Sequence, residues 1–249
     1  MSAAPPAGEE RALALMVAAN RAAVQATVCG WLVHDLRGPT QAISLLADLA
    51  EQGESTDDPS LRQILLGASR RLVDLVALFD RSIRPPEIRP AAPGPLSLRD
   101  MVELIVHLHR VSHSPARLDA TAALEAPLPA VHATEPALLH VLLNLLLNAQ
   151  EASTRADREA GTIRLAAGRG ADPRFVELAV EDEGPGVPEE IRPRLFRPFA
   201  TGKPEPHHPL AGLGLAVTRH LLEQLGGWIR YEPRERGARF VIGLRVSEA

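Results

Sequence analysis

The feature that most constrains the fold is an apolar segment with two asparagines four residues apart. Residues 138–153, LLHVLLNLLLNAQEAS, are almost continuously apolar, which predicts a helix that packs in a core. Asn144 and Asn148 lie on one face of that helix, because side chains at i and i+4 are stacked one turn apart. Taken alone, the pair favours plain core packing, with two amides that hydrogen-bond a neighbouring loop. The segments downstream change this interpretation.

Three short motifs follow the helix in order: DEGPGVP at 182–188, LFRPFATGK at 195–203 and GLGLA at 212–216. In the first, Asp182 ends an apolar strand and is followed by Gly184 and Gly186. A carboxylate there can accept from an exocyclic amino group, and the glycines let the backbone approach a ring. The same residue types also favour a surface turn. The motif alone therefore indicates a turn before it indicates a site.

The third motif places Gly212 and Gly214 directly before a predicted helix. Backbone N–H groups at a helix start can bind phosphate, although a single G-x-G is a weak signal. The preceding residues 201–211 have the composition of a loop. Within it, Lys203 can reach phosphate, but a solvated side chain is the simpler interpretation.

Together, the four blocks resemble the ATP-binding domain of sensor histidine kinases, within the wider Bergerat-type ATPase group, from about residue 96 onward. The resemblance implies that Asp182 binds the adenine amino group and that residues 201–211 form the ATP lid. It also implies that Asn148 is the ligand of Mg²⁺, a hard cation that accepts neutral oxygen ligands. The implied contacts to ATP and Mg²⁺ come from Asn148, Asp182, Gly184, Gly186, Phe199, Thr201, Lys203, Gly212, Leu213 and Gly214.

Two parts of this match have a second interpretation. Phe196 and Phe199 match the family's phenylalanine box, and hydrophobic anchoring of the lid is compatible with that role. Asn144 stands where ATP-hydrolysing relatives carry a glutamate that activates water. An asparagine cannot act as a general base near neutral pH, so Asn144 argues for transfer of the phosphoryl group to another nucleophile.

The predicted nucleophile lies upstream, in HDLRGPTQAI at 34–43, which resembles the family's H-box. His34 lies nearly opposite the apolar stripe of its helix and should face solvent, and a neutral imidazole is a competent nucleophile near pH 7. Asp35 can hydrogen-bond the other ring nitrogen or take up a proton, and Arg37 can meet phosphate oxygens. Pro39 should bend the helix. An isolated His-Asp pair would more often be a solvated surface.

One position departs from the family pattern. Many members carry Thr or Asn four residues after the histidine, where the side chain helps to hydrolyse the partner's aspartyl phosphate. Here that position is Gly38, which predicts weak or absent phosphatase activity. The remaining histidines, including His113 and His140, show no paired metal-ligand pattern with acids, so we expect structural or surface roles for them.

The chain divides into four predicted parts. Residues 1–8 are an Ala- and Pro-rich disordered tail, and residues 9–82 form an antiparallel helical hairpin with an apolar stripe on each helix. Residues 83–95 hold five prolines and form a linker. Residues 96–249 form the ATP-binding domain. The predicted fold class is α+β: the hairpin pairs with a second copy into a dimeric four-helix bundle, and the domain is a two-layer α/β sandwich.

Composition excludes several other classes of function. Net charge is −4 and pI about 6.1, which argues against electrostatic binding of nucleic acid. The single Cys29 allows no internal disulfide and fits a reducing compartment. The N-terminus lacks a basic segment followed by an apolar one, and the apolar run at 12–19 is too short to span a bilayer. We therefore expect a cytoplasmic protein without direct membrane insertion.

The sequence thus predicts a homodimeric histidine kinase that binds Mg-ATP, phosphorylates His34 and passes the phosphate to the receiver domain of a response regulator. Few residues precede His34, so the input is expected from a separate sensor protein. The main alternative is a dimeric histidine phosphotransferase that relays phosphate without using ATP itself. A serine kinase acting on a partner protein and a nucleotide-switched scaffold are further alternatives.

Overall fold

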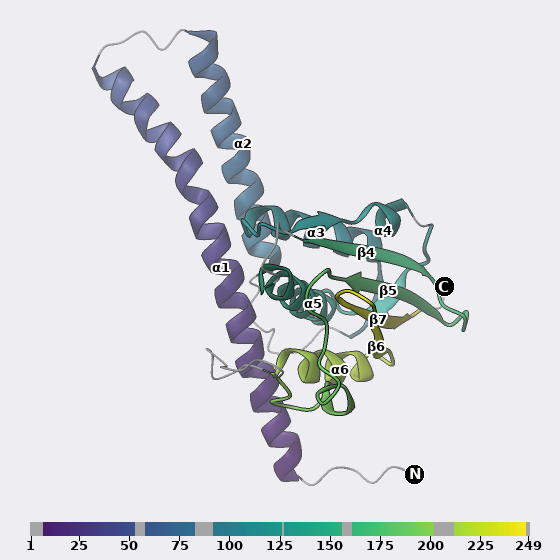
Figure 1. Cartoon of the computed structure of the whole chain (residues 1–249). Helices are drawn as coiled ribbons and strands as arrows, with labels where there is room; N and C mark the ends of the chain where they lie inside the picture. The colour runs from purple at the N-terminus through teal and green to yellow at the C-terminus, as the bar shows by residue number, and fades with distance from the viewer. Residues whose placement is uncertain are drawn as a thin grey trace.

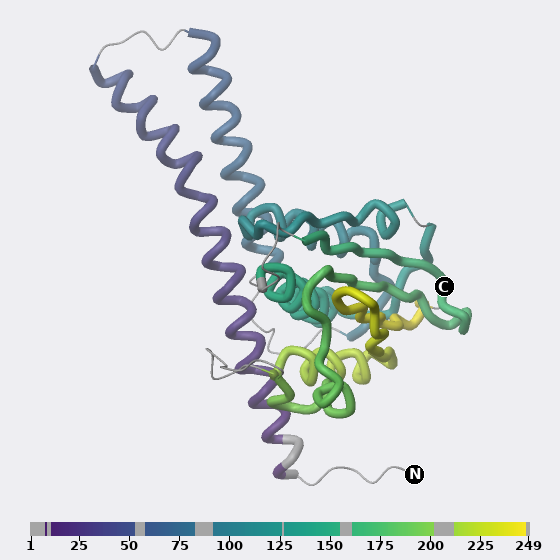
Figure 2. Tube along the Cα trace, in the orientation of Figure 1, coloured from purple at the N-terminus to yellow at the C-terminus, as the bar shows by residue number. Residues whose placement is uncertain are grey.

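The chain forms a long helical hairpin and an α/β domain that packs beside it (Figure 1). The computed structural model describes residues 7–52, 58–82, 92–125, 127–155, 161–201 and 212–247. Most of the predicted tail at 1–8 and most of the predicted linker at 83–95 lie outside these residues. Figure 2 follows the chain from the hairpin, across its two antiparallel arms, into the domain.

The hairpin consists of α1 (Ala7–Glu51) and α2 (Pro59–Ser82). Pro39 lies inside α1, and the helix continues through it. In this turn Thr40 Oγ1 donates to the carbonyl oxygens of Leu36 at 2.8 Å and Arg37 at 2.9 Å. These bonds lie next to the backbone hydrogen bond that the proline removes. At the start of α2, Asp58 Oδ1 accepts from the backbone N–H of Ser60 at 2.8 Å, which lowers the pKa of Asp58.

The domain is built on a five-stranded sheet in the order β2-β4-β5-β7-β6. Its strands are β2 (Arg117–Asp119), β4 (Thr162–Arg169), β5 (Phe175–Glu181), β6 (Trp228–Pro233) and β7 (Ala238–Arg245). Only the β2–β4 pair is parallel. A second sheet pairs β1 (Gly94–Leu96) with β3 (Val131–Ala133). The helices are α3 (Leu98–Val111), α4 (Thr121–Glu125), α5 (Glu135–Arg155) and α6 (Gly214–Gln224), with a short 3-10 turn at Arg192–Arg194.

Strand alternation gives the sheet one apolar face and one charged face. Leu178 and Ile242, both 0% exposed, lie on the apolar face, which packs against α3, α5 and α6 (Figure 1). On the other face Arg230 bonds Glu177 at 2.8 Å, and Arg239 bonds Glu181 at 2.6 Å. The domain is therefore a two-layer α/β sandwich, which confirms the predicted helical region followed by an α/β domain; the predicted dimeric bundle stays a prediction.

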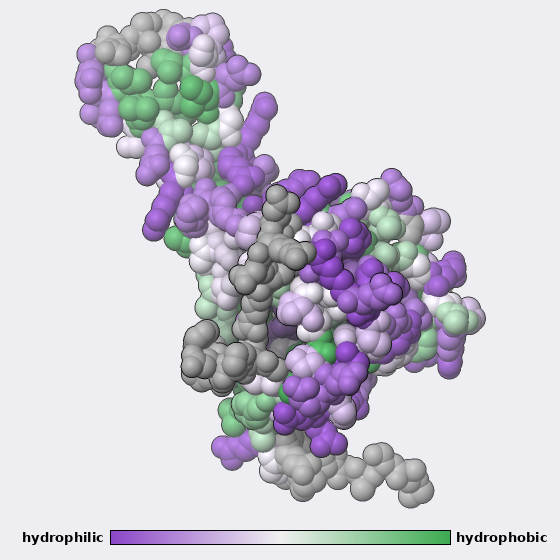
Figure 3. All heavy atoms as spheres, in the orientation of Figure 1, coloured by the Kyte–Doolittle hydropathy of each residue, from purple (hydrophilic) through white to green (hydrophobic). Residues whose placement is uncertain are grey.

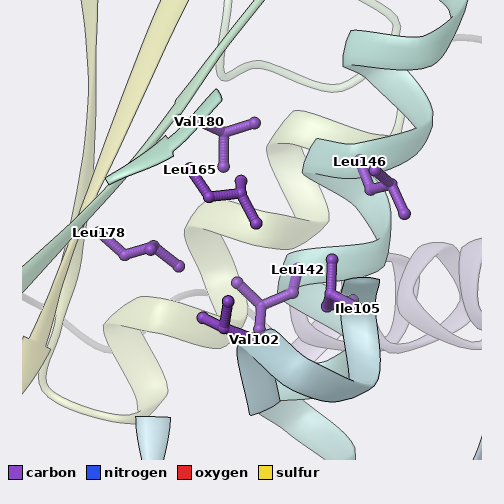
Figure 4. Close-up of a pocket in the computed structure, with 7 residues that line it drawn as sticks. All are labelled: Val102, Ile105, Leu142, Leu146, Leu165, Leu178 and Val180. Atoms are coloured by element: carbon purple, nitrogen blue, oxygen red, sulfur yellow. The ribbon is translucent and has the colours of Figure 1, made fainter. Parts of the chain in front are cut away.

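The core between the layers contains a small pocket (Figure 4). Its lining comes from α3, α5, β4 and β5 and is entirely aliphatic: Val102, Ile105, Leu142, Leu146, Leu165, Leu178 and Val180. Such a lining offers no donor or acceptor to a phosphate or a purine. The pocket is a feature of core packing, and the candidate site is built from polar residues elsewhere.

The hairpin has a covered part and an uncovered part. Val24, Val28 and Leu32 of α1 are buried in the same core as α3 and α5. Toward the far end, apolar side chains gather on the surface (Figure 3). Seven exposed apolar residues are called the uncovered face below: Leu45, Ile64, Leu65 and Leu66 toward the far end, and Val73, Val76 and Phe79 in the domain-side half of α2.

Four local predictions differ from the structure. The sequence of residues 117–124 predicts one strand, but these residues form β2 and then α4. The reason is that Asp119 Oδ1 accepts from the backbone N–H of Thr121 at 3.1 Å and turns the chain into a helix. Gly94 and Pro95, placed in the linker, belong to β1; a proline is tolerated in this two-stranded sheet. Ala7 and Gly8 belong to α1. The short strand β3 was not predicted.

Candidate functional site

The asparagine-bearing face of α5 lies against the first turn of α6. A Cβ atom at Gly214 would lie 3.5 Å from Asn144 Oδ1 and 3.8 Å from Asn148 Nδ2, so both predicted asparagines face this glycine. Asn148 Nδ2 is buried and has no hydrogen-bond partner among the described residues. Rotation of the carboxamide exchanges its nitrogen and oxygen, and this side chain can therefore present an oxygen ligand to a magnesium ion.

Asp182 directly follows β5, and its carboxylate is buried, at 5% exposure. Its Oδ1 accepts from the backbone N–H of Gly184 at 2.9 Å and of Ala238 at 3.3 Å. Burial raises the pKa of Asp182, and this effect outweighs the two hydrogen bonds, which lower it. The carboxylate is thus held rigidly, with Oδ2 available for a further donor.

The two glycines after Asp182 are required by close backbone approach. A Cβ at Gly184 would lie 2.8 Å from the Cβ of Ala152 on α5, closer than real Cβ atoms approach one another. Gly186 has φ +76°, in the left-handed region. The DEGPG turn therefore lies directly on the asparagine-bearing helix, which places Asp182 and Asn148 on the same side of the domain.

The base of the predicted lid is formed by Gly212 and Phe199. Gly212 has φ +81° and Phe199 has φ +61°, and a Cβ at Gly212 would lie 2.8 Å from the carbonyl carbon of Phe199. Leu213 is buried and forms the N-cap of α6 without a side-chain hydrogen bond. The first N–H groups of α6 thus lack a side-chain cap and are suited to an anion. Thr201 is partly exposed, and Lys203 lies outside the described residues.

The predicted acceptor lies on α1, where the hairpin meets the end of α3. His34 is exposed, as expected for an acceptor, and its Nδ1 lies 3.1 Å from Nε2 of His113. The same Nε2 lies 2.7 Å from Asp35 Oδ1, and Asp35 Oδ2 accepts from Arg71 of α2. Arg37 is exposed one turn away. His113 therefore stands between Asp35 and His34, where the sequence predicted a direct bond.

This contact corrects the prediction that the remaining histidines lack an acidic partner. His113 pairs with Asp35 across 78 residues of sequence, and no local pattern reveals such a pair. A second unpredicted cluster joins α1 to α5: Asn20 Oδ1 accepts from His140 Nε2 at 2.8 Å and from Asn144 Nδ2 at 3.1 Å. Burial lowers the pKa of His140 to about 4, with a smaller contribution from Arg21.

The two halves of the candidate site are separated along α1. Asn20 marks the level of Asn144, and His34 lies fourteen residues further along α1. At a rise of 1.5 Å per residue this separation is about 21 Å. The structure thus brings together Asn144, Asn148 and Gly214, and separately His34, Asp35 and His113, but it does not bring the two groups into contact.

The fold and these residues define a class: a Bergerat-type ATP-binding domain attached to a histidine-bearing helical hairpin. Consistent with this, residues 133–248 match the family model described as histidine kinase-, DNA gyrase B-, and HSP90-like ATPase. The chain thus contains an ATPase domain of this kind, and curated relatives that it matches are named sensory histidine kinases.

Two relatives illustrate the similarity. The sensory histidine kinase/phosphatase NtrB of Rhodobacter capsulatus is 28% identical over 229 residues, which cover 87% of this chain and 61% of NtrB. The C4-dicarboxylate transport sensor protein DctB of Rhizobium meliloti is 30% identical over 238 residues, which cover 93% of this chain and 36% of DctB. The chain thus spans less than two thirds of the length of either relative.

Solved structures agree on the fold. The catalytic domain of the histidine kinase ThkA superposes with a TM-score of 0.50 and 26% identity, covering 62% of this chain and 96% of that domain. The mycobacterial sensor histidine kinase MprB superposes with a TM-score of 0.52 and 23% identity, covering 63% of this chain and 100% of MprB in that structure.

Proposed function

We propose that this chain binds Mg-ATP, phosphorylates its own His34 and transfers the phosphoryl group to an aspartate in the receiver domain of a response regulator. The observation that carries the proposal is the convergence of Asp182, Asn148 and the uncapped start of α6 around one side of the domain. An exposed histidine on the attached hairpin provides the acceptor.

In this proposal each residue of the domain has a defined task. Asp182 accepts a hydrogen bond from the adenine amino group through Oδ2. The N–H groups of Gly214 and its neighbours bind the phosphates, as does Lys203 from the lid. Asn148 holds Mg²⁺, which neutralises charge on the phosphates. Phe199, Thr201, Gly212 and Leu213 form the base of the lid.

The chemical step transfers the γ-phosphoryl group from ATP to an imidazole nitrogen of His34. A P–N bond forms, the P–O bond to ADP breaks, and the ring proton passes to Asp35 or to water. Arg37 bonds the transferred oxygens. Asn144 acts as a hydrogen-bond donor in the structure, to Asn20 at 3.1 Å, which agrees with transfer and not hydrolysis.

The separation of about 21 Å along α1 means that the described arrangement is not the one in which transfer occurs. Transfer requires the domain to move along the hairpin, or the histidine of a second copy to reach the site. We propose a homodimer, because the uncovered face is large and apolar and a four-helix bundle would bury it.

We also propose that phosphatase activity is weak, although NtrB is named a kinase/phosphatase. Gly38 has no side chain to orient a water molecule, and a Cβ built there meets nothing within 4 Å. A Gly38→Thr variant therefore fits the helix without a clash. It should raise the rate at which a phosphorylated regulator loses its phosphate.

The proposed cellular setting is supported by the packing of α1. Residues Arg11–Glu51 form a helix long and apolar enough to cross a membrane by length and composition. The apolar stripe of α1, however, packs on the domain through Val24, Val28 and Leu32. We propose a cytoplasmic protein that receives its input from a separate sensor protein.

The test is incubation of the purified chain with γ-labelled ATP and magnesium, beside His34→Ala, Asn148→Ala and Asp182→Asn variants. Acid-labile, alkali-stable label in the wild type that is lost in all three variants is the expected result. The alternative is a dimeric phosphotransferase that relays phosphate without ATP. It predicts no label from ATP but His34-dependent label from a phosphorylated regulator.

A further inference from the structure

Three side chains with metal-binding groups converge where the hairpin meets the domain. His34 and Asp35 come from α1, and His113 comes from the turn that follows α3. One ligand atom from each lies within 4.8 Å of the other two. The rings of His34 and His113 meet edge to face, with centroids 4.6 Å apart. The cluster is thus formed by two parts of the fold and not by one local motif.

The hydrogen positions of this cluster leave one atom unsatisfied. His113 Nε2 lies 2.7 Å from Asp35 Oδ1 and 3.1 Å from His34 Nδ1. A neutral ring carries one proton on that nitrogen at most, and the carboxylate can only accept. When this proton is directed to Asp35, an unprotonated His34 Nδ1 is left without a donor from the cluster. A divalent cation satisfies the carboxylate and both imidazoles simultaneously.

The spacing is close to that of a zinc site. Ligand atoms at about 2.0–2.2 Å from a tetrahedral zinc are separated by about 3.4 Å from one another. The observed 3.1 Å and 2.7 Å require an opening of several tenths of an ångström. His113 is 52% exposed, so its ring can make this adjustment. The exposed rings also leave a fourth position open to water.

The surroundings orient the ligands. Arg71 of α2 bonds Asp35 Oδ2, which leaves Oδ1 directed at the cluster, as a hydrogen-bonded carboxylate ligand requires. His113 follows the C-cap Ser112 and has φ +51°, in the left-handed region. This conformation is uncommon for a residue other than glycine, and it holds the ring off the end of α3 against α1.

We propose that His34, Asp35 and His113 form a zinc site that locks the domain onto the hairpin and withholds His34 from phosphorylation. Imidazole ligands select zinc over magnesium, so Mg-ATP does not fill the site. Bound zinc joins α1 to the domain at a level about 21 Å from Asn144, and thereby stabilises an arrangement in which transfer cannot occur. The inhibitory half rests on the proposed function, whereas zinc binding does not.

The first experiment measures zinc binding directly, without reference to activity. The full chain is stripped with chelator and titrated with zinc chloride by calorimetry, in a His207→Ala/His208→Ala background that removes the two consecutive histidines of the predicted lid. We expect one zinc per chain. The background should bind it about tenfold or more tightly than the same background with His113→Ala added. His107→Ala, in the helix that precedes His113 but outside the cluster, is the matched control. Equal affinity in the wild type and His113→Ala would overturn the proposal.

The second experiment measures the effect of zinc on the phosphorylation of His34. One equivalent of zinc should lower labelling of His34 at least tenfold in the wild type and in His107→Ala, and leave His113→Ala unchanged. A chain that gains no label from ATP is assayed with a phosphorylated regulator as donor, so failure of the kinase proposal does not remove the test. Zinc that binds through His113 without changing the labelling of His34 would overturn the inhibitory half.

Discussion

Two faces of the hairpin have very different surroundings. In the proximal segment of α1, Asn20, Val24, Val28 and Leu32 are at most 6% exposed because they pack in the core with the α/β domain. On the uncovered face, Leu45, Val73 and Val76 are at least 60% exposed. The proximal segment finds its partner within the chain, and the uncovered face lacks one among the described residues.

One hairpin can thus serve two roles, contact with the domain and contact with a second copy. Contacts in the proximal segment include a polar cluster around Asn20, which fixes a specific orientation. The uncovered face is apolar and repetitive, which suits a symmetric bundle with a second copy.

The largest effect should come from charge on the uncovered face. A Val73→Asp/Val76→Asp variant would bury carboxylates in the proposed bundle, so we expect it to be monomeric where the wild type is a dimer. Light scattering coupled to size-exclusion chromatography measures the change. Gln63→Asp, at an exposed polar position of the same helix, should remain dimeric. A monomeric wild type would remove the basis for the proposed bundle.

The proximal segment should make stability depend on pH. The pKa of His140 is lowered to about 4 from an ordinary value of 6.5, so the unfolded chain takes up the proton first. The contribution of neutral His140 to the free energy of unfolding is complete above pH 6.5 and is lost as the pH falls toward 4. The loss amounts to about 3 kcal/mol.

Urea unfolding at several pH values between 4 and 7 measures this loss. His140→Gln keeps a donor for Asn20 but cannot titrate, and its stability should decline less steeply over that range. Parallel curves for the two proteins would contradict the assignment.

Removing the acceptor of the same cluster should have a smaller effect. Asn20→Leu leaves His140 Nε2 and Asn144 Nδ2 buried without their partner, and should lower the free energy of unfolding by about 1–3 kcal/mol. Asn20→Asp retains an acceptor oxygen and is the matched control. Equal stability of Asn20→Leu and wild type would show that these hydrogen bonds do not hold α1 on the domain.

The smallest effect on stability is expected at Gly38 of α1. A Cβ there meets nothing within 4 Å, and glycine inside a helix is less favourable than alanine. Gly38→Ala should therefore raise the free energy of unfolding by about 0.5–1 kcal/mol. Thermal unfolding measures the gain, and a loss of stability would indicate that this position contacts a neighbour in the dimer.

Much of the domain was predictable because its signals are local. The alternation of β4 and β5, the helical pattern of α5 and the Gly226–Gly227 end of α6 all arise from residues close in sequence. The break between β2 and α4 was missed because a single side-chain bond at Asp119 decides it. Asp side chains make such bonds in loops as well as at helix starts.

The site was predictable only residue by residue. Motifs identified Asn148, Asp182 and Gly214, but nothing local could place His113 beside His34 or Asn20 beside Asn144. Those pairs are 79 and 124 residues apart, and their contact depends on how the hairpin docks on the domain. The same docking determines that the acceptor and the nucleotide residues are apart.

The continuity of α1 has a mechanical consequence. Fourteen residues at 100° each place Asn20 and His34 within about 40° of one another around the helix axis, and each engages the domain through its own cluster. A twist of α1 about its axis would therefore disengage both contacts in a single motion. A bend at Pro39, which lies beyond both residues, would leave them engaged. The helix is thus suited to transmit a twist to both contacts at once.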